Sequence, residues 1–192
     1  GHALNAALVF LLARACFRAA GIEPLGTNPS RGWWSALAAA LFFGLHPLRV
    51  EVVAWASALP YVLALAFLLA SALLYLRDGD SFRGITLAAL AYGASLLSRP
   101  LALGFPFILL AVDLARRRPL RRALVGKLPF ALLAVGAGLL EAAARPFVDL
   151  ERVGLGPRLS AAAAAPYRYL GRAFLPMELS PLDALPLTPR TS

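Results

Sequence analysis

The chain has 192 residues, of which 60% are hydrophobic and 15% charged. Soluble domains are roughly 45–50% apolar and about 25% charged, so the composition excludes an ordinary soluble domain and indicates an integral membrane protein. The net charge of +9 comes almost entirely from arginine, since Lys127 is the only lysine. The arginines lie at the ends of apolar runs rather than on one basic face, which excludes nucleic acid as a partner and fits the positive-inside rule. Cys16 is alone, so no disulfide framework is expected.

The first two apolar runs are Ala3–Phe17 and Trp33–Leu45. The first is marginal beside the roughly 20 residues that a helix needs to cross a bilayer. Between the two runs, Gly21–Gly32 is rich in Gly, Pro, Asn and Ser, a composition typical of a loop. Trp33 and Trp34 open the second run and suit an anchor at the membrane interface.

The stretch His46–Tyr61 joins the second apolar run to the third. His46, Arg49 and Glu51 fall close together here, in a chain with few polar side chains. If a helix begins at Pro47, a position that proline prefers, Arg49 and Glu51 point to nearly opposite sides and cannot pair. Unpaired charge at membrane depth is costly. These residues therefore form either a functional site or an ordinary turn at the membrane interface. Their physical properties alone favour neither interpretation over the other.

The strongest spanning segment is Val52–Leu76, which Pro60 should kink or mark where it enters the membrane. A charged turn, Arg77–Arg83, follows it. The next two runs, Ile85–Leu97 and Leu101–Leu114, are shorter. They either cross with bilayer thinning and snorkelling or form a re-entrant pair that does not cross.

The densest basic segment, Arg116–Lys127, leads into another apolar run, Pro129–Ala144. Leu159–Pro176 is Ala-rich and carries Arg168 and Arg172 on one helical face, a pattern that suits an interfacial helix at least as well as a spanning one. We predict an all-α fold, a polytopic bundle of about five to seven membrane helices plus this interfacial helix. The predicted domains are a transmembrane core over residues 1–176 and a Pro-rich tail or linker over residues 177–192.

Two acidic residues interrupt the later apolar runs. Asp113 is expected to pair locally with Arg116 or Arg117. Glu141 is expected to pair with Arg145, four residues further along the same helix face. Both pairings would neutralise a charge without requiring a functional site.

Charge placement predicts which side each connection faces if every run crosses once. The basic connections, which the positive-inside rule assigns to the cytoplasm, are Arg14–Arg31, Arg77–Arg83 and Arg116–Lys127. The opposite, extracytoplasmic side then holds His46–Glu51, Ser98–Pro100 and Arg145–Arg158.

Guanidinium groups bind phosphate bidentately, while a carboxylate and an imidazole suit a divalent metal, a sugar hydroxyl or acid–base work. The combination of arginine, histidine and glutamate side chains at this face indicates a lipid-phosphate substrate. The competing interpretation makes His46 a helix-boundary residue and Arg99 a snorkelling arginine.

Four segments, in their order and spacing, resemble a family of polytopic membrane proteins with a GT-C glycosyltransferase-like domain: HPLRVEVVAW, LLSRPLALGFPFILLAVDL, KLPF and YRYLGRAFLP. The chain is similar to protein O-mannosyltransferases, including the transmembrane tetratricopeptide-repeat type. The family motif His-Pro-x-x-x-Glu-x-x-Ala-Trp is matched by His46, Pro47, Glu51, Ala54 and Trp55. A second motif, Leu-Leu-(Lys/Arg)-Pro, is matched loosely by Leu97, Arg99 and Pro100.

The resemblance implies transfer of a sugar, with mannose as one candidate, from a polyprenyl- or dolichyl-phosphate donor to an extracytoplasmic acceptor, a protein or a glycan. It implies that Arg99 holds the lipid phosphate. It also implies that His46, Glu51 and Arg49 line a donor or metal pocket, with a divalent metal ion as a candidate cofactor. The implied location is the bacterial inner membrane or the ER membrane, with the site on the extracytoplasmic or lumenal side.

The chain departs from the family pattern in three ways. The family's acidic catalytic motif follows a first transmembrane helix, so we expect the general base to precede Gly1 and this chain to be a fragment. Leu59, Pro60 and Tyr61 replace a charged Arg-Lys-Asp-like cluster, and tetratricopeptide repeats are absent. Two alternatives stay open: a transporter or flippase of lipid-linked solutes, and a non-catalytic membrane scaffold.

Overall fold

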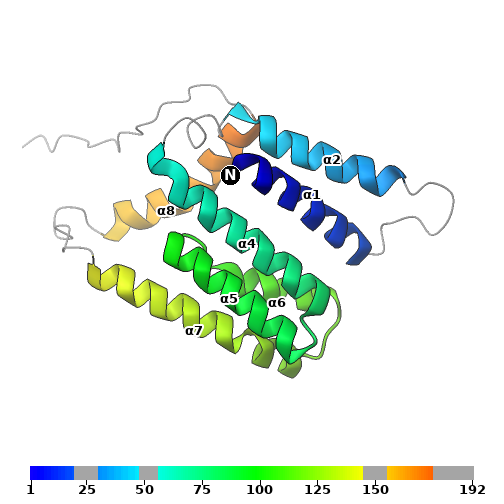
Figure 1. Ribbon diagram of the computed structural model, residues 1–192. Coiled ribbons are helices and arrows are strands. Elements are labelled where there is room, and N and C mark those ends of the chain that lie inside the picture. Colours follow the sequence, from blue (N-terminus) through cyan, green and yellow to red (C-terminus); the bar gives the residue numbers. More distant parts are fainter. Residues whose placement is uncertain (20–29, 48–55, 145–154, 175–192) are drawn as a thin grey trace, which may run out of the picture. The chain divides into compact units, whose positions relative to one another are not determined.

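The computed structural model describes residues 1–19, 30–47, 56–144 and 155–174, and it is all-helical over these residues (Figure 1). The described elements are α1 (His2–Ala19), α2 (Ser30–Leu45), the 3-10 turn η2 (Ala56–Ala58), α4 (Leu59–Asp78), α5 (Phe82–Ser98), α6 (Phe105–Ala115), α7 (Leu120–Ala144) and α8 (Leu155–Phe174). Three of them, α1, α4 and α7, are long and apolar enough to cross a membrane. The all-α prediction is confirmed, and these helices are compatible with a membrane protein.

The chain divides into two compact units, Gly1–Pro146 and Phe147–Ser192. The second unit contributes α8, which carries Pro166 within it and whose apolar and polar residues separate onto two faces more clearly than in the other helices. It is not among the helices apolar enough to span a membrane. All of the contacts described below lie within the first unit.

The boundaries of α4 and α5 follow from local chemistry. Pro60 sits in the first turn of α4, where its missing N–H has no helical partner to lose, so it marks the start of the helix rather than a kink. The side chain of Ser81 caps α5 by accepting a hydrogen bond of 2.9 Å from the Gly84 amide. A Cβ at Gly84 would lie 2.0 Å from the carbonyl oxygen of Asp78, so only glycine permits this close turn between the two helices.

Helix α5 runs antiparallel to α4 along its full length. At one end the Ser81 amide donates to the Asp78 carbonyl (3.0 Å), and at the other end the Arg99 guanidinium lies over the Tyr61 ring. The chain then returns through the non-helical residues 99–104 into α6, which at 11 residues is only about 16 Å long. Within that return, the Tyr92 hydroxyl donates to the Ala102 carbonyl (2.9 Å), the kind of partner that irregular backbone needs at membrane depth.

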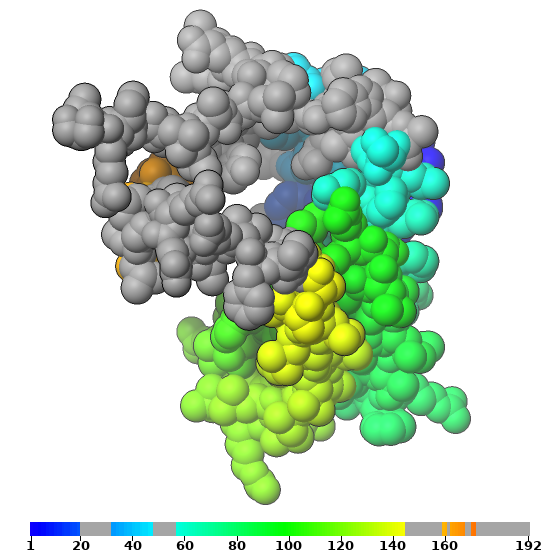
Figure 2. Space-filling view, turned by 90° about the vertical axis from the view of Figure 1, so that its left-hand side faces the viewer, coloured from blue at the N-terminus to red at the C-terminus, as the bar shows by residue number. Residues whose placement is uncertain are grey.

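The helices of the first unit pack around α4 and α5. Helix α4 contacts α1 on one side and α5 on the other, α1 also contacts α2, and α7 contacts both α5 and α6. Figure 2 shows one face of this unit, on which the atoms of α4, α5 and α7 form adjoining bands. Two interhelical hydrogen bonds join α4 to α5: Ser71 Oγ donates to the Ala88 carbonyl and Ser95 Oγ to the Ala64 carbonyl, each at 2.7 Å. Small hydroxyl side chains of this kind are typical of helix contacts in membranes.

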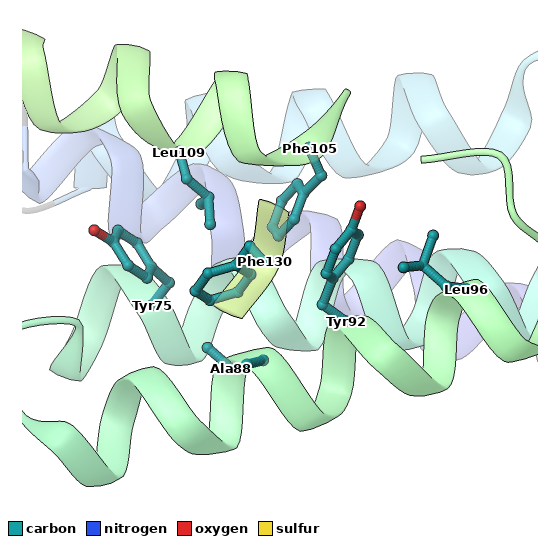
Figure 3. Close-up of a cluster of buried hydrophobic side chains, with 8 residues drawn as sticks. Tyr75, Ala88, Tyr92, Leu96, Phe105, Leu109 and Phe130 are labelled. Carbon is teal, nitrogen blue, oxygen red and sulfur yellow. The ribbon is translucent and has the colours of Figure 1, made fainter. Parts of the chain in front are cut away.

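An aromatic core joins α4, α5, α6 and α7 (Figure 3). Phe130, with no exposed surface, lies among three other rings, at centroid distances of 5.9 Å from Tyr75, 5.9 Å from Tyr92 and 6.3 Å from Phe105. Such edge-on and tilted ring pairs add about 0.5–1.5 kcal/mol each beyond the burial of area. The core therefore fixes how these four helices meet.

Several helix starts differ from the predicted boundaries, and those of α2 and α7 show why. Helix α2 begins at Ser30, so the end of the expected loop is already helical. Helix α7 begins at Leu120 and includes much of the basic segment that was predicted as a connection, with Pro129 in its interior. Arginine and lysine are good helix formers, so a basic stretch at a membrane surface continues a helix as readily as it interrupts one. The helix expected to begin at Pro47 would run through residues 48–55, which lie outside the described part of the chain.

Candidate functional site

Arg99 lies just beyond α5, at the end of the bundle where α1 and α4 begin. Pro100 disfavours helical geometry for the residue before it, so α5 ends at Ser98 and Arg99 is extended, with φ −161° and ψ 125°. Its guanidinium carbon is 4.6 Å from the centre of the Tyr61 ring, a cation–π contact. Within the described residues, no carboxylate pairs with this guanidinium. We call this the Arg99 end of the bundle.

A cavity of about 250 Å³ lies beside Arg99, between α1, α4 and α5. Its polar lining consists of His2, Asn5, Tyr61, Ser95 and Arg99, and the rest of the lining is apolar apart from backbone. Asn5 is 1% exposed. Its amide nitrogen donates to the Val62 carbonyl (3.0 Å), but its Oδ1 has no hydrogen-bond partner among the described residues. The cavity therefore offers an unused buried acceptor close to a cation.

The histidines at this end are held by aromatic contacts. The Nε2 atom of His2 is 3.0 Å from the Gly44 carbonyl oxygen, and its ring stacks on Phe43 at 5.5 Å. His46, which follows α2 and is half-buried, packs edge-on against Phe42 at 5.0 Å. The contact between His2 and Gly44 brings the end of α2 beside the start of α1, so the two histidines share the Arg99 end.

Of the four predicted site residues, only two can be placed. Arg99 lines the cavity and His46 lies near the same end without lining it. Arg49 and Glu51 lie outside the described residues. The predicted donor or metal pocket thus remains a prediction for those two positions.

Comparisons of the chain with models of known protein families, with curated proteins and with solved structures find no match. The candidate functions therefore depend on the residues, motifs and geometry of this chain.

The described residues do not assemble a metal site. In that part of the chain no three His, Cys, Asp or Glu side chains come together, and the polar lining of the Arg99 cavity includes no carboxylate. A divalent cation prefers several oxygen ligands, usually with carboxylates among them. The described lining does not fit such an ion.

A second polar cluster lies at the opposite end of the bundle, around Asp113. The Lys127 ammonium is 2.5 Å from Asp113 Oδ2, the Tyr75 hydroxyl donates to the same oxygen at 2.6 Å, and Lys127 also donates to the Tyr75 hydroxyl. Arg118 completes the cluster by donating to Asp113 Oδ1 (3.1 Å) and to Asp80 Oδ2 (2.8 Å). We call this the Arg118 end.

The Asp113 cluster corrects the pairing predicted for that carboxylate. Asp113 pairs with Lys127 and Arg118 rather than with Arg116 or Arg117, the neighbours expected from the sequence. The cluster has two carboxylates, the buried Asp113 and the exposed Asp80, and two cations, Lys127 and Arg118, so the buried Asp113 and Lys127 are each paired. This arrangement holds α4, α6 and α7 together and leaves no free group for chemistry.

Sequence reasoning missed the roles of His2, Asn5 and Tyr61 at the cavity and of Lys127 in the core. A signal existed for some of them. His2 and Asn5 are polar residues at the head of an apolar run, and Lys127 is the only lysine in a chain that otherwise uses arginine. Tyr61 carried no such signal, because an aromatic residue near the start of a membrane helix is ordinary.

Proposed function

We propose that this chain is the membrane core of a glycosyltransferase that binds a polyprenyl- or dolichyl-phosphate-linked sugar at the Arg99 end. The proposal is carried by one observation: a guanidinium without a carboxylate partner among the described residues stands on an aromatic ring at the edge of a polar-lined cavity. It is supported by the motif resemblance around His46 and Arg99, and the comparisons add nothing to it.

Arg99 has the properties of a phosphate ligand. Guanidinium presents a rigid fork of donors that matches two phosphate oxygens at once. The cation–π contact with the Tyr61 ring helps to hold this guanidinium in place. During transfer, the bond between the sugar and the phosphate breaks and negative charge grows on the leaving lipid phosphate. A fixed cation beside that phosphate stabilises the developing charge.

The cavity beside Arg99 suits a polar headgroup rather than a whole lipid. Its volume of about 250 Å³ lies just below the roughly 300–1,000 Å³ usual for drug-sized ligands. The buried Oδ1 of Asn5 can accept a hydrogen bond from a sugar hydroxyl, because no described residue donates to it. Burying such an acceptor without a donor costs about 1–3 kcal/mol, so a hydroxyl donor in the cavity would gain from it.

An apolar groove could hold the isoprenoid chain of the same ligand. It lies between α5 and α7, has a volume of about 610 Å³ and is lined mainly by leucine, glycine and alanine. Leu97 and Pro100, which flank Arg99 in the chain, both line this groove. A lipid whose phosphate sits on Arg99 would therefore have an apolar path within reach.

The proposal assigns no general base. The acceptor hydroxyl must lose its proton to a base, and no carboxylate is among the described residues that line the Arg99 cavity. Glu51 and Arg49 keep their proposed place in the donor pocket. The transporter alternative gains nothing from Asp113 and Lys127, because that pair is closed by hydrogen bonds and lies toward the ends of its helices, not along an open path.

Binding of the donor lipid tests the proposal directly. We expect the purified chain in lipid nanodiscs to bind polyprenyl-phosphate-mannose, and Arg99→Ala to weaken that binding at least about tenfold, the loss of one charge-assisted phosphate contact. Arg83→Ala is the matched control, because this exposed arginine lies at the opposite end of α5. Wild-type affinity in Arg99→Ala, or equal losses in both variants, would reject the assignment. Solute uptake into proteoliposomes without lipid-sugar binding would favour the transporter.

A further inference from the structure

A second cavity, distinct from both polar clusters, opens at the Arg118 end between α1 and α4. It has a volume of about 600 Å³. Four arginines from three separate segments line it, namely Arg14, Arg18, Arg77 and Arg116. The remaining lining is aliphatic, with Leu11 and Leu73 among it. It therefore combines a cationic rim with an apolar wall.

Among the described residues that line this cavity there is no Asp or Glu. Arg14 Nε is buried and has no hydrogen-bond partner among the described residues, and Arg116 donates to the Leu76 carbonyl only at the long distance of 3.5 Å. Asp80 lines a different cavity and is paired with Arg118. Arg14 and Arg116 bring two positive charges to one cavity, and like charges repel unless an anion lies between them. These two arginines therefore favour an anionic ligand.

We propose that this cavity binds an anionic phospholipid. The phosphodiester lies against Arg14 and Arg116, since guanidinium groups bind phosphate oxygens in pairs, and an acyl chain lies along Leu11 and Leu73. The aliphatic wall distinguishes this ligand from free phosphate, which has no apolar part. The predicted sidedness agrees with it, because a cytoplasmic leaflet is the one that carries anionic lipid. The inference does not depend on the proposed transfer reaction.

Native mass spectrometry of the detergent-solubilised chain tests the site, with phosphatidylglycerol, phosphatidylcholine and inorganic phosphate as separate probes. We expect retention of phosphatidylglycerol over phosphatidylcholine and no competition by millimolar phosphate. Arg14→Gln should weaken phosphatidylglycerol binding about tenfold or more. This substitution removes no described hydrogen bond of Arg14 Nε, so the fold is expected to survive it.

Arg121→Gln is the matched control, because Arg121 carries the same charge at the same end but lines a different cavity. It should bind phosphatidylglycerol as the wild type does. Equal losses in Arg14→Gln and Arg121→Gln would overturn the proposal in favour of general surface charge. Displacement of the lipid by inorganic phosphate would overturn it in favour of a free anion. Should Arg14→Gln unfold, Leu73→Trp, which fills the apolar wall and keeps every arginine, must lower lipid binding, and unchanged binding there would also overturn it.

Discussion

The Lys127 ammonium lies 2.5 Å from the Asp113 carboxylate although the two side chains are only 6% and 1% exposed. Each stands on a different helix, α7 and α6, and the Tyr75 hydroxyl of α4 donates to the same carboxylate oxygen. A buried pair of this kind is strongly destabilising to break but contributes little when compared with well-packed apolar residues. Its main effect is to specify how three helices meet.

Breaking this pair from one side should be costly. We expect Asp113→Asn or Lys127→Met alone to destabilise the bundle by about 3–5 kcal/mol, because each leaves a buried charge without its partner. The double variant should cost clearly less than the sum of the two. Unfolding by sodium dodecyl sulfate in mixed micelles, monitored by circular dichroism, gives the unfolding free energies for this double-mutant cycle. Additive costs would mean that the two charges do not interact.

The aromatic core should be sensitive to a single truncation. Phe130→Ala removes the ring that touches Tyr75, Tyr92 and Phe105, and we expect a loss of about 3–5 kcal/mol from the cavity left behind. Leu132→Ala, on the same helix but 71% exposed, should change unfolding by less than about 0.5 kcal/mol. Similar losses in the two variants, measured by the same unfolding assay, would show that Phe130 is not part of a packed core.

The serine hydrogen bonds between α4 and α5 make a finer prediction. Ser71→Ala and Ser95→Ala each remove a bond to the facing helix, worth on average about 0.6 kcal/mol in membrane bundles. Ser98→Ala is the control, since that hydroxyl donates to the Ala94 carbonyl of its own helix. We expect reduced unfolding free energy in the first two variants only. A loss in Ser98→Ala as large as theirs would contradict the interhelical role.

Sidedness can be read from two leucines at opposite ends. Leu101 (67% exposed) lies next to Arg99, and Leu120 (56% exposed) begins α7 beside the basic segment. In a Cys16→Ser background, a membrane-impermeant thiol reagent applied outside intact cells should label Leu101→Cys and spare Leu120→Cys. Labelling of both positions from the same side would reject the predicted topology.

Local pattern was enough to predict most of the helices. The apolar runs predicted the existence and order of α1, α2, α4, α5 and α6. Pro60, expected either to kink the third run or to mark where it enters the membrane, lies in the first turn of α4. The predicted helix boundary was wrong where charged residues of high helix propensity had been assigned to a connection. Because arginine and lysine favour a helix, α7 begins at Leu120 rather than at Pro129.

Of the residues predicted for the site, Arg99 lines the cavity and His46 lies at the same end without lining it. Their position at the ends of apolar runs is a feature of the sequence itself, and so is the segregation of arginine into alternate connections. The residues that line the cavity with Arg99 could not be predicted from the sequence. Tyr61 and Asn5 come close to it only because α1, α4 and α5 pack together.

Composition and run length by themselves determined that this is a helical chain suited to a membrane, since apolar stretches of that length must satisfy their backbone within a helix. Only the tertiary structure decided which charges meet. Asp113 has basic neighbours in sequence at Arg116 and Arg117, yet it bonds to Lys127 and Arg118. Helix packing, rather than sequence distance, sets the separation between those side chains, and Coulomb energy depends on that separation and on burial.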